Sequence, residues 1–413
     1  MGSTSSVSTH TPGGSRSSTA GTPRAGWPAV VAVTLGIFSI VTTEILPIGL
    51  LTEIGAGFTV SDGAAGLTMT MPGFLAAVAA PAVTVATARV DRRLMLCALT
   101  GLLALANFLA AAAPAYWLVL VSRVLVGVVI GGFWSIGVGL AERLVAPASV
   151  GRATAVIFSA VPLGSVLGVP AGTFIGEVAG WRTAFVVMGG LTLGVLLMLL
   201  LFLPPLPARR VTRPGVLRGA LRGAGTRGAL LLTFLVVLAH FGAYTYVTPF
   251  LEQVTGAGPA RITVFLLVYG VAGIAGNFAG GVLVGRRPRA AFGLAAGAIA
   301  AATLLLPVLG RGSSGAVALL IVWGVGYGAV PVCSQTWFAR ANPGAPEVAS
   351  VLFTASFQAT ISMGALVGGS VLDRTSPSTV MVLGGVTASL MVVAVCLTGS
   401  SCRRRRAGVA SEG

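Results

Sequence analysis

The sequence predicts an all-α integral membrane protein with twelve transmembrane helices in two pseudo-symmetric six-helix bundles. Its 413 residues are 55% hydrophobic and only 9% charged, whereas soluble domains carry roughly 25% charged residues. Twelve apolar runs are long enough to cross about 30 Å of hydrocarbon as helices. The basic residues alternate between successive loops in the way that a twelve-span topology requires.

Each predicted span is a run of about 20 or more mostly apolar residues. The 58 glycines lie largely within these runs, where small residues let membrane helices approach one another closely. The predicted spans cover approximately residues 27–51, 63–86, 94–113, 117–140, 153–177, 183–205, 228–251, 262–284, 290–309, 315–338, 348–371 and 378–399.

Composition divides the chain into five parts. A Ser-, Thr-, Gly- and Pro-rich tail has too few apolar residues to fold, and a Pro- and Arg-rich linker separates two halves that repeat the same order of spans and basic turns. The first apolar run is too long for a signal-peptide core and is expected to remain as a span. The parts are a disordered cytoplasmic tail (1–26), a first bundle (27–205), a cytoplasmic linker (206–227), a second bundle (228–399) and a basic cytoplasmic tail (400–413).

All 26 basic residues are arginines, against ten acidic residues, so the net charge is +16. With both termini on the cytoplasmic side, 21 arginines lie in inner segments and four in outer loops, which follows the positive-inside rule. Because the arginines punctuate apolar runs instead of covering a soluble face, a nucleic-acid partner is not expected. The predicted location is the cell membrane, where Arg403–Arg406 can meet anionic lipid head groups.

Glu44 is the one acidic residue that falls in the interior of a predicted span and not at its end. An ionisable group at this depth costs several kcal/mol unless it is protonated, paired or facing water. The functional interpretation is a proton carrier that loads and releases its proton as its access changes. The alternative is a structural hydrogen bond to a neighbouring helix.

Arg123 is the one arginine that must enter the membrane, in the fourth span and at a depth similar to that of Glu44. We predict that the two side chains couple, with Arg123 favouring the charged form of Glu44 in one conformation and releasing it in another. The alternative is that Arg123 extends its charged end to the outer interface.

Asp91, Arg92 and Arg93 form a basic turn between the second and third spans. They predict either a plain orientation signal or a cytoplasmic latch, in which the Asp pairs across the interface between the halves until transport breaks the contact.

Polar and aromatic residues scattered through the spans predict a mostly apolar substrate cavity, which suits a small neutral or lipophilic compound. His240 and Tyr244 share one face of the seventh span by their spacing of four, although buried packing is the alternative for a lone histidine. The predicted cavity residues are Trp134, His240, Tyr244, Asn277, Gln335 and Gln358.

The sequence predicts no metal, cofactor or enzyme activity. Cys97, Cys333, Cys396 and Cys402 lie in spans or on the cytoplasmic side, where disulfides are not expected. The only histidines are His10 and His240, so no zinc-ligand spacing or nucleophile–base pair is present.

Several motifs resemble one known family. The most specific is the Gly- and Pro-rich fifth span, and others include Thr43-Glu44 in the first span and Arg123 through Gly127 in the fourth. They resemble the drug/proton antiporter branch of the major facilitator superfamily, in particular its bacterial sugar, purine nucleoside and chloramphenicol efflux members. The fifth-span antiporter motif that this resemblance implies comprises Gly164, Gly168, Pro170, Gly172 and Gly176.

The turn after the second span departs from the family pattern. Thr87 stands where the family has its first Gly, and Leu94 directly follows Arg93. In the second half, Gly285 occupies the corresponding position where an Asp would stand. Only Asp91, Arg92 and Arg93 therefore match the family's latch.

The resemblance and the single intramembrane acid together imply a proton-coupled efflux transporter that exports a drug, antibiotic, sugar or nucleoside by alternating access. We expect it to act as a monomer with a small-molecule substrate, protons and membrane lipids as its partners. Two alternatives stay open: an uncoupled facilitator or importer of a sugar or nucleoside, and a non-transporting membrane sensor.

Overall fold

The computed structural model describes residues 26–86, 90–137, 140–207, 219 and 221–410. Among these residues, twelve helices are long and apolar enough to cross a membrane, which confirms the predicted number of spans. The predicted tail before Gly26, most of the central linker and the last three residues lie outside the described part.

The first half opens with a long apolar helix that ends at Gly49, two residues before the predicted end of its span. Pro47 lies in its last turn and has no backbone N–H to donate; a turn at Leu50 follows, from which a short helix continues. The helices of this half are α1 (Gly26–Gly49), α2 (Leu51–Phe58), α3 (Asp62–Ala65), α4 (Leu67–Ala86), α5 (Arg92–Ala111), α6 (Tyr116–Gly137), α7 (Ala141–Leu144), α8 (Val150–Ala179) and α9 (Trp181–Phe202).

Prolines begin four helices of the second half, where the missing N–H costs nothing because the first turn of a helix has no internal acceptor for it. The last helix continues past the predicted end of its span, to Ala410. The helices are α11 (Ala224–Tyr244), α12 (Val247–Gln253), α13 (Pro259–Arg286), α14 (Pro288–Leu309), α15 (Ser313–Ala341), α16 (Pro346–Leu372) and α17 (Pro377–Ala410).

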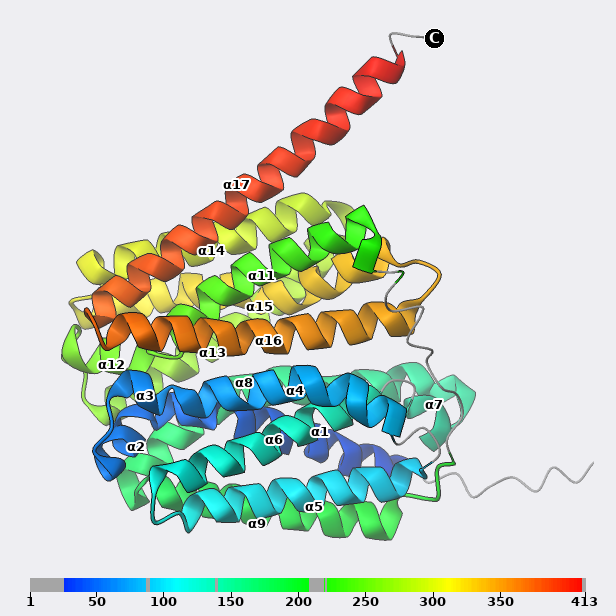
Figure 1. Cartoon of the computed structure of the whole chain (residues 1–413), viewed down its shortest axis with the longest axis vertical. Coiled ribbons are helices and arrows are strands. Elements are labelled where there is room, and N and C mark those ends of the chain that lie inside the picture. Colours follow the sequence, from blue (N-terminus) through cyan, green and yellow to red (C-terminus); the bar gives the residue numbers. More distant parts are fainter. Residues whose placement is uncertain (1–25, 87–89, 138–139, 208–218, 220, 411–413) are drawn as a thin grey trace, which may run out of the picture.

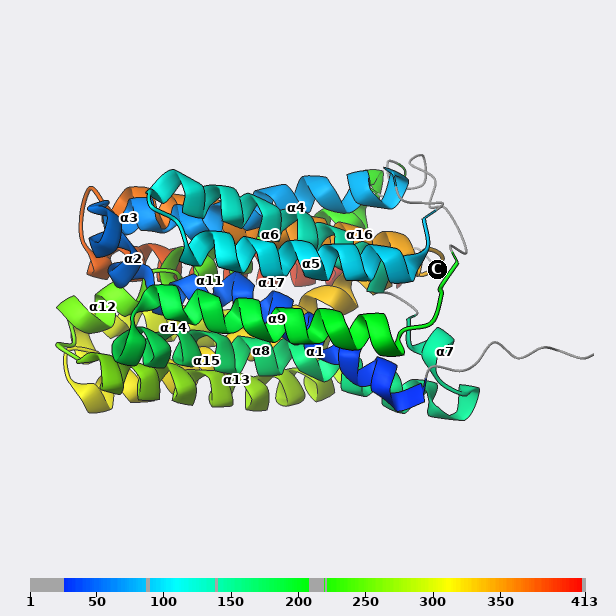
Figure 2. The same ribbon diagram turned by 90° about the horizontal axis from the view of Figure 1, so that it is seen from below.

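The two halves form two layers of roughly parallel helices (Figure 1). The helices α5 and α9 lie side by side on the face of the first half that is turned away from the second (Figures 1 and 2). The halves meet where α4 packs against α16 and where α8 packs against α13. Gly73 on α4 makes the first contact possible, because a Cβ there would collide with Ser362 and with the backbone of Gln358.

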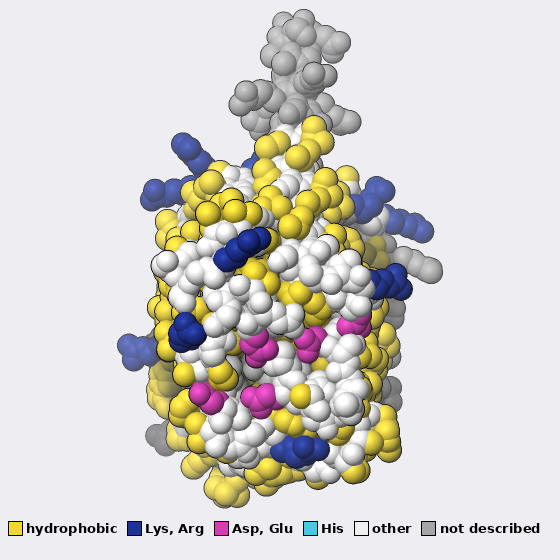
Figure 3. Space-filling model, turned by 90° about the vertical axis from the view of Figure 1, so that its left-hand side faces the viewer, with side chains coloured by type: hydrophobic (Ala, Val, Ile, Leu, Met, Phe, Trp, Pro, Cys, Tyr) yellow, Lys and Arg dark blue, Asp and Glu magenta, His cyan; other side chains and the backbone are white. Residues whose placement is uncertain are grey.

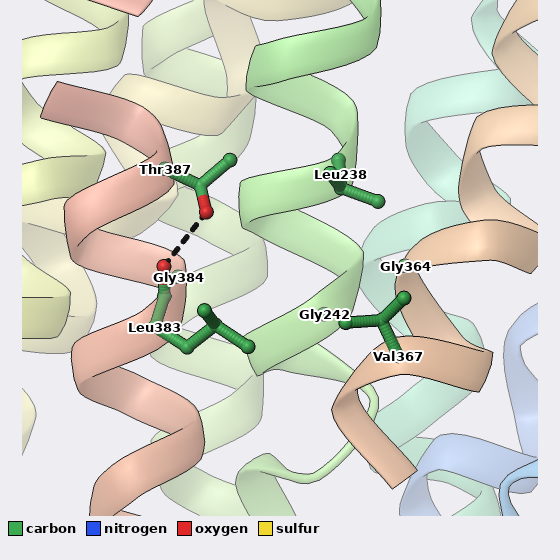
Figure 4. A pocket seen from close by; sticks show the side chains of 7 residues that line it. All are labelled: Leu238, Gly242, Gly364, Val367, Leu383, Gly384 and Thr387. Carbon is green, nitrogen blue, oxygen red and sulfur yellow. Dashed lines mark hydrogen bonds between the residues drawn. The ribbon is translucent and has the colours of Figure 1, made fainter. Parts of the chain in front are cut away.

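The outside of the helices carries many exposed large apolar side chains, including Val178, Phe278 and Val308. Such a surface is unfavourable in water and suited to lipid tails. A small crevice of about 100 Å³ between α11, α16 and α17 interrupts it, lined partly by Gly242, Gly364 and Gly384 (Figure 4).

Candidate functional site

Arg123 is fully buried on α6 and ties three helices together. Its Nε donates to the carbonyl oxygen of Thr68 on α4 at 2.9 Å, and its two terminal nitrogens donate to the carbonyl oxygens of Thr43 and Glu44 on α1 at 3.0 and 2.9 Å. The side chain therefore does not extend to the interface. It lies inside the first half and bonds the backbone of the residue with which it was predicted to couple.

The Glu44 carboxyl lies at the junction between the halves. It is 7% exposed, makes a hydrogen-bonding contact with the side chain of Gln358 on α16 and is electrostatically attracted by Arg123. It also interacts electrostatically with the Tyr327 hydroxyl on α15. The single intramembrane carboxyl is thus surrounded by an arginine of its own half and by polar groups of the other half.

The backbone around Glu44 is held by a second polar contact. Asn107 on α5 donates through Nδ2 to the Thr43 hydroxyl at 3.2 Å and to the Leu103 carbonyl oxygen at 3.0 Å. Both Thr43 and Asn107 are buried. Together with Arg123, this contact fixes the segment of α1 from which the Glu44 side chain emerges.

A cluster of aromatic rings lies beside Glu44 in the second half. His240 stacks on Tyr327 with ring centroids 3.4 Å apart, and Tyr244 stacks on Tyr269 at 4.5 Å. Trp323 meets His240 edge-on and donates its Nε1–H to His240 Nδ1 at 3.0 Å. We call His240, Tyr244, Tyr269, Trp323 and Tyr327 the aromatic cluster.

Sequence reasoning selected His240 and Tyr244 for the cavity but missed Tyr269 and Tyr327. The chain has only five tyrosines, and four of them, Tyr244, Tyr246, Tyr269 and Tyr327, are in the second half. That concentration in otherwise apolar spans was the available signal, because a buried phenol needs a polar neighbour.

Of the remaining predicted cavity residues, Gln358 meets Glu44, and the described contacts join none of the others to the aromatic cluster. Trp134 packs against Phe158 within the first half. Asn277 is half-buried on α13, and Gln335 is exposed on α15. The structure therefore groups Glu44, His240, Tyr244 and Gln358 together.

In the predicted latch, the described contacts stay within the first half. The Asp91 carboxylate caps the N-terminus of α5 by accepting from the Arg93 backbone N–H at 2.7 Å. The Arg93 side chain donates to the Leu200 carbonyl oxygen at 2.6 Å, and the Arg92 N–H donates to the Leu206 carbonyl oxygen. These bonds join α5 to the end of α9 and to the segment after it.

The glycines of the fifth-span motif form the contact face between α8 and α1. A Cβ at Gly168 would lie 3.0 Å from Ile45, one at Gly172 would lie 2.9 Å from Leu46, and one at Gly176 would lie 2.6 Å from Leu50. Pro170 is buried within the same helix. The motif therefore seats α8 against the helix that carries Glu44.

Replacing Gly172 by Ala is expected to destabilise the protein by about 1–3 kcal/mol, since the added methyl meets Leu46 in a packed contact. Thermal unfolding in detergent measures the change. Gly190→Ala on α9 is the matched control, because nothing lies within 4 Å of its added Cβ and replacing a helical Gly there should be neutral or stabilising. Equal melting temperatures for the two variants would contradict the prediction.

One end of the bundle joins the two halves through carboxylates, and we call it the acidic end. Asp373 accepts from the Ser61 hydroxyl at 2.9 Å and from the Gly63 N–H at 3.0 Å, and Glu252 accepts from the Thr52 hydroxyl at 3.1 Å. In the space-filling view of this end, acidic side chains gather near the middle of the face (Figure 3).

The acidic end is closed. Besides the carboxylate contacts, the Thr248 hydroxyl donates to the Ile48 carbonyl oxygen at 2.9 Å in a buried position. Toward the other end, an apolar surface crevice of about 410 Å³ lies between Phe74 on α4, the exposed Leu231 on α11 and Ser356 on α16. Ser356 is two residues from Gln358 on α16 and therefore points to a different face of the helix from the one that meets Glu44.

Acidification is expected to favour closure of the acidic end. Burial, and then the carboxylates of Asp62 and Glu53, raise the pKa of Glu252 above its ordinary 4.5, against the opposite effect of the Thr52 hydroxyl. Burial and then Glu177 likewise raise the pKa of Glu53. A raised pKa means that the closed form binds the proton more tightly than an open form in which Glu252 has its ordinary pKa of 4.5. Closure therefore gains stability at low pH, and it loses this stability as the pH rises from 4.5 through the raised pKa.

Double electron–electron resonance can follow this closure as a distance between two spin labels. The labels are attached to cysteines introduced at Val178 and Arg311 in a background without other cysteines. Both positions are exposed and belong to opposite halves. We expect the short-distance population to grow from about pH 8 to about pH 5 and to grow less in Glu252→Gln. A population that shrinks on acidification would contradict the sign of the effect.

The chain matches the model of a known protein family. A family model described as the Major Facilitator Superfamily matches residues 32–345, which is most of the chain. The chain belongs to the Major Facilitator Superfamily. It is a transporter of this superfamily and not an enzyme.

Its relatives within the Major Facilitator Superfamily match over nearly their whole length. The purine ribonucleoside efflux pump NepI of Escherichia coli K12 is 30% identical over 393 residues, which cover 93% of this chain and 96% of that pump. The pump of the same name from Shigella flexneri matches equally.

Solved superfamily structures share the fold at low sequence identity. A bacterial homologue of the human lysosomal transporter Spinster, in an inward-facing and occupied conformation, aligns with a TM-score of 0.69 at 18% identity, over 90% of this chain and 96% of that one. The human organic anion transporter MFSD10 aligns with a TM-score of 0.63 at 18% identity, over 89% of this chain and 99% of that one.

Proposed function

We propose that this transporter is a proton-coupled exporter of a small neutral compound and that purine ribonucleosides are the first class to test. One observation carries the proposal. The buried Glu44 carboxyl contacts Gln358 of the opposite half, so any movement of one half against the other changes the surroundings of this carboxyl. A carboxyl whose surroundings alternate can gain a proton in one state and lose it in the other.

The acidic end is proposed to face the outside of the cell membrane, because this orientation places 21 of the 26 arginines on the cytoplasmic side. Closure at this end then corresponds to a conformation that receives substrate from the cytoplasm. Protons from outside would reach Glu44 after the acidic end opens, and they would leave after it closes again.

The aromatic cluster supports a planar, uncharged substrate. Tyr327 is not fully buried, and its hydroxyl interacts electrostatically with Glu44 at the junction between the halves. Base–aromatic stacking contributes about 1–3 kcal/mol per base in nucleic-acid complexes. The buried Gln358 Oε1 has no hydrogen-bond partner among the described residues, and it could accept from an amino or hydroxyl group of a nucleoside.

The test is uptake of radiolabelled inosine into inside-out membrane vesicles, because export from the cell corresponds to uptake in this orientation. We expect accumulation when the vesicle interior is acidic, and its loss when an ionophore collapses the pH gradient. Chloramphenicol and a neutral sugar, assayed in parallel, define the substrate class. Equilibration of inosine that is insensitive to the gradient would contradict proton coupling and indicate a facilitator.

A further inference from the structure

We propose that His240 is a neutral positioning residue for the Glu44 site and not a second proton carrier, an inference that rests on the proposed proton coupling at Glu44. Its Nδ1 accepts the Trp323 Nε1–H at 3.0 Å. An indole N–H can only donate, so Nδ1 must keep its lone pair. The ring proton of His240 is therefore on Nε2.

The second edge of the ring also opposes protonation. His240 Nε2 is buried and has no hydrogen-bond partner among the described residues. An imidazolium donates from both nitrogens, but here one nitrogen faces a donor and the other meets no acceptor. An unpaired charge within a membrane span is strongly unfavourable, so this geometry favours the neutral ring.

The groups around His240 supply no compensating negative charge. Its ring neighbours are Tyr244 on its own helix, Tyr269 on α13, and Trp323 and Tyr327 on α15, together with Phe241. The helices α16 and α17 also pack on α11, and their described spans 348–372 and 377–397 contain no charged residue. The carboxyl that interacts with this cluster is that of Glu44, through the Tyr327 hydroxyl.

The role of the neutral ring is to orient Tyr327. The rings of His240 and Tyr327 are almost parallel, at 7° and 3.4 Å between centroids, and Phe241 meets the Tyr327 ring edge-on at 90°. These two contacts set the plane of Tyr327 and hence the position of its hydroxyl beside Glu44. Without the His240 ring, Tyr327 gains freedom to rotate, and the polar surroundings of Glu44 change.

The protonation state can be measured without any transport assay, because the chain contains only two histidines. In His10→Gln protein labelled with ¹⁵N-histidine, every histidine signal belongs to His240. We expect the neutral tautomer with hydrogen on Nε2 from about pH 8 to about pH 5, the range in which an ordinary histidine titrates. Protonation of His240 within this range, or a proton on Nδ1, would overturn the proposal.

The variant Trp323→Phe in the same background removes the donor that faces Nδ1. The ring should stay neutral, since no counter-charge faces it, but the tautomer with hydrogen on Nδ1 is expected to appear because no donor opposes it any longer. Trp134→Phe is the matched control, because Trp134 packs against Phe158 in the other half, and its spectrum should equal that of the parent. A Trp323→Phe spectrum with hydrogen on Nε2 alone, as in the parent, would show that Trp323 does not hold the tautomer.

Transport tests the positioning role separately. His240→Phe keeps an uncharged ring against Tyr327, so the midpoint of the pH profile of proton-driven inosine uptake should stay at the parental value even where the uptake rate falls because the Trp323 Nε1–H has lost its acceptor. His240→Ala removes the ring and should move the midpoint of the pH profile by at least about half a unit, and melting curves confirm that it is folded. Loss of proton coupling in His240→Phe, or an unchanged profile in His240→Ala, would contradict the proposal. The ¹⁵N spectra remain informative even if inosine is not a substrate.

Discussion

Replacing Glu44 by Gln is expected to abolish proton-driven export while leaving the protein folded. The amide has nearly the shape of the carboxylic acid and can keep the contact with Gln358, but it cannot release a proton. We expect the rate of uptake driven by a pH gradient in inside-out vesicles to fall by about 100-fold or more, which corresponds to an increase of about 2.7 kcal/mol or more in its activation free energy. Exchange of labelled for unlabelled substrate, which needs no net proton movement, should persist.

Glu177→Gln is the matched control for this substitution. Glu177 is an exposed carboxylate at the acidic end of α8, so its replacement removes the same charge without touching the junction between the halves. Its proton-driven uptake should equal that of the parent. A Glu44→Gln protein that still accumulates substrate against a gradient would show that the coupling proton binds elsewhere.

Replacing Arg123 by Met is expected to destabilise the first half by about 3 kcal/mol or more. The substitution leaves the carbonyl oxygens of Thr43, Glu44 and Thr68 without their donor, and each buried unsatisfied acceptor costs about 1–3 kcal/mol. It also removes the positive charge that attracts the Glu44 carboxyl. We expect a lower melting temperature and loss of transport, measured by thermal unfolding and by vesicle uptake.

Two further variants separate the hydrogen bonds of Arg123 from its charge. Arg123→Lys keeps the charge, but a single ammonium group cannot reproduce the planar fork of donors that reaches three carbonyls, so intermediate stability is expected. Arg311→Met is the surface control, because the Arg311 side chain is exposed and, among the described residues, bonds the Pro307 carbonyl oxygen of its own turn. Its unfolding free energy should stay within about 0.5 kcal/mol of the parent, and an Arg123→Met protein of equal stability would contradict the proposed structural role.

Glu44 and Arg123 could be selected from the sequence because each is an isolated ionisable residue in an apolar run, and the energetic cost of that position is local information. The partners of Arg123 could not be selected in this way. They are backbone carbonyl oxygens, which every residue has, so no sequence pattern marks them. Likewise, the Asp91 carboxylate caps its own helix in the structure, and its sequence position did not distinguish this role from an interaction across the halves.

The sequence by itself determined that the chain crosses the membrane twelve times, because the transfer of each apolar segment into lipid depends on that segment alone. Which side chains meet was decided only by the tertiary structure. Inside lipid, apolar surface does not select one helix partner over another, so the pairing depends on close packing and polar contacts between distant segments. Gly73 against α16 is one such contact, and the meeting of Glu44 with Gln358 and Tyr327 is another.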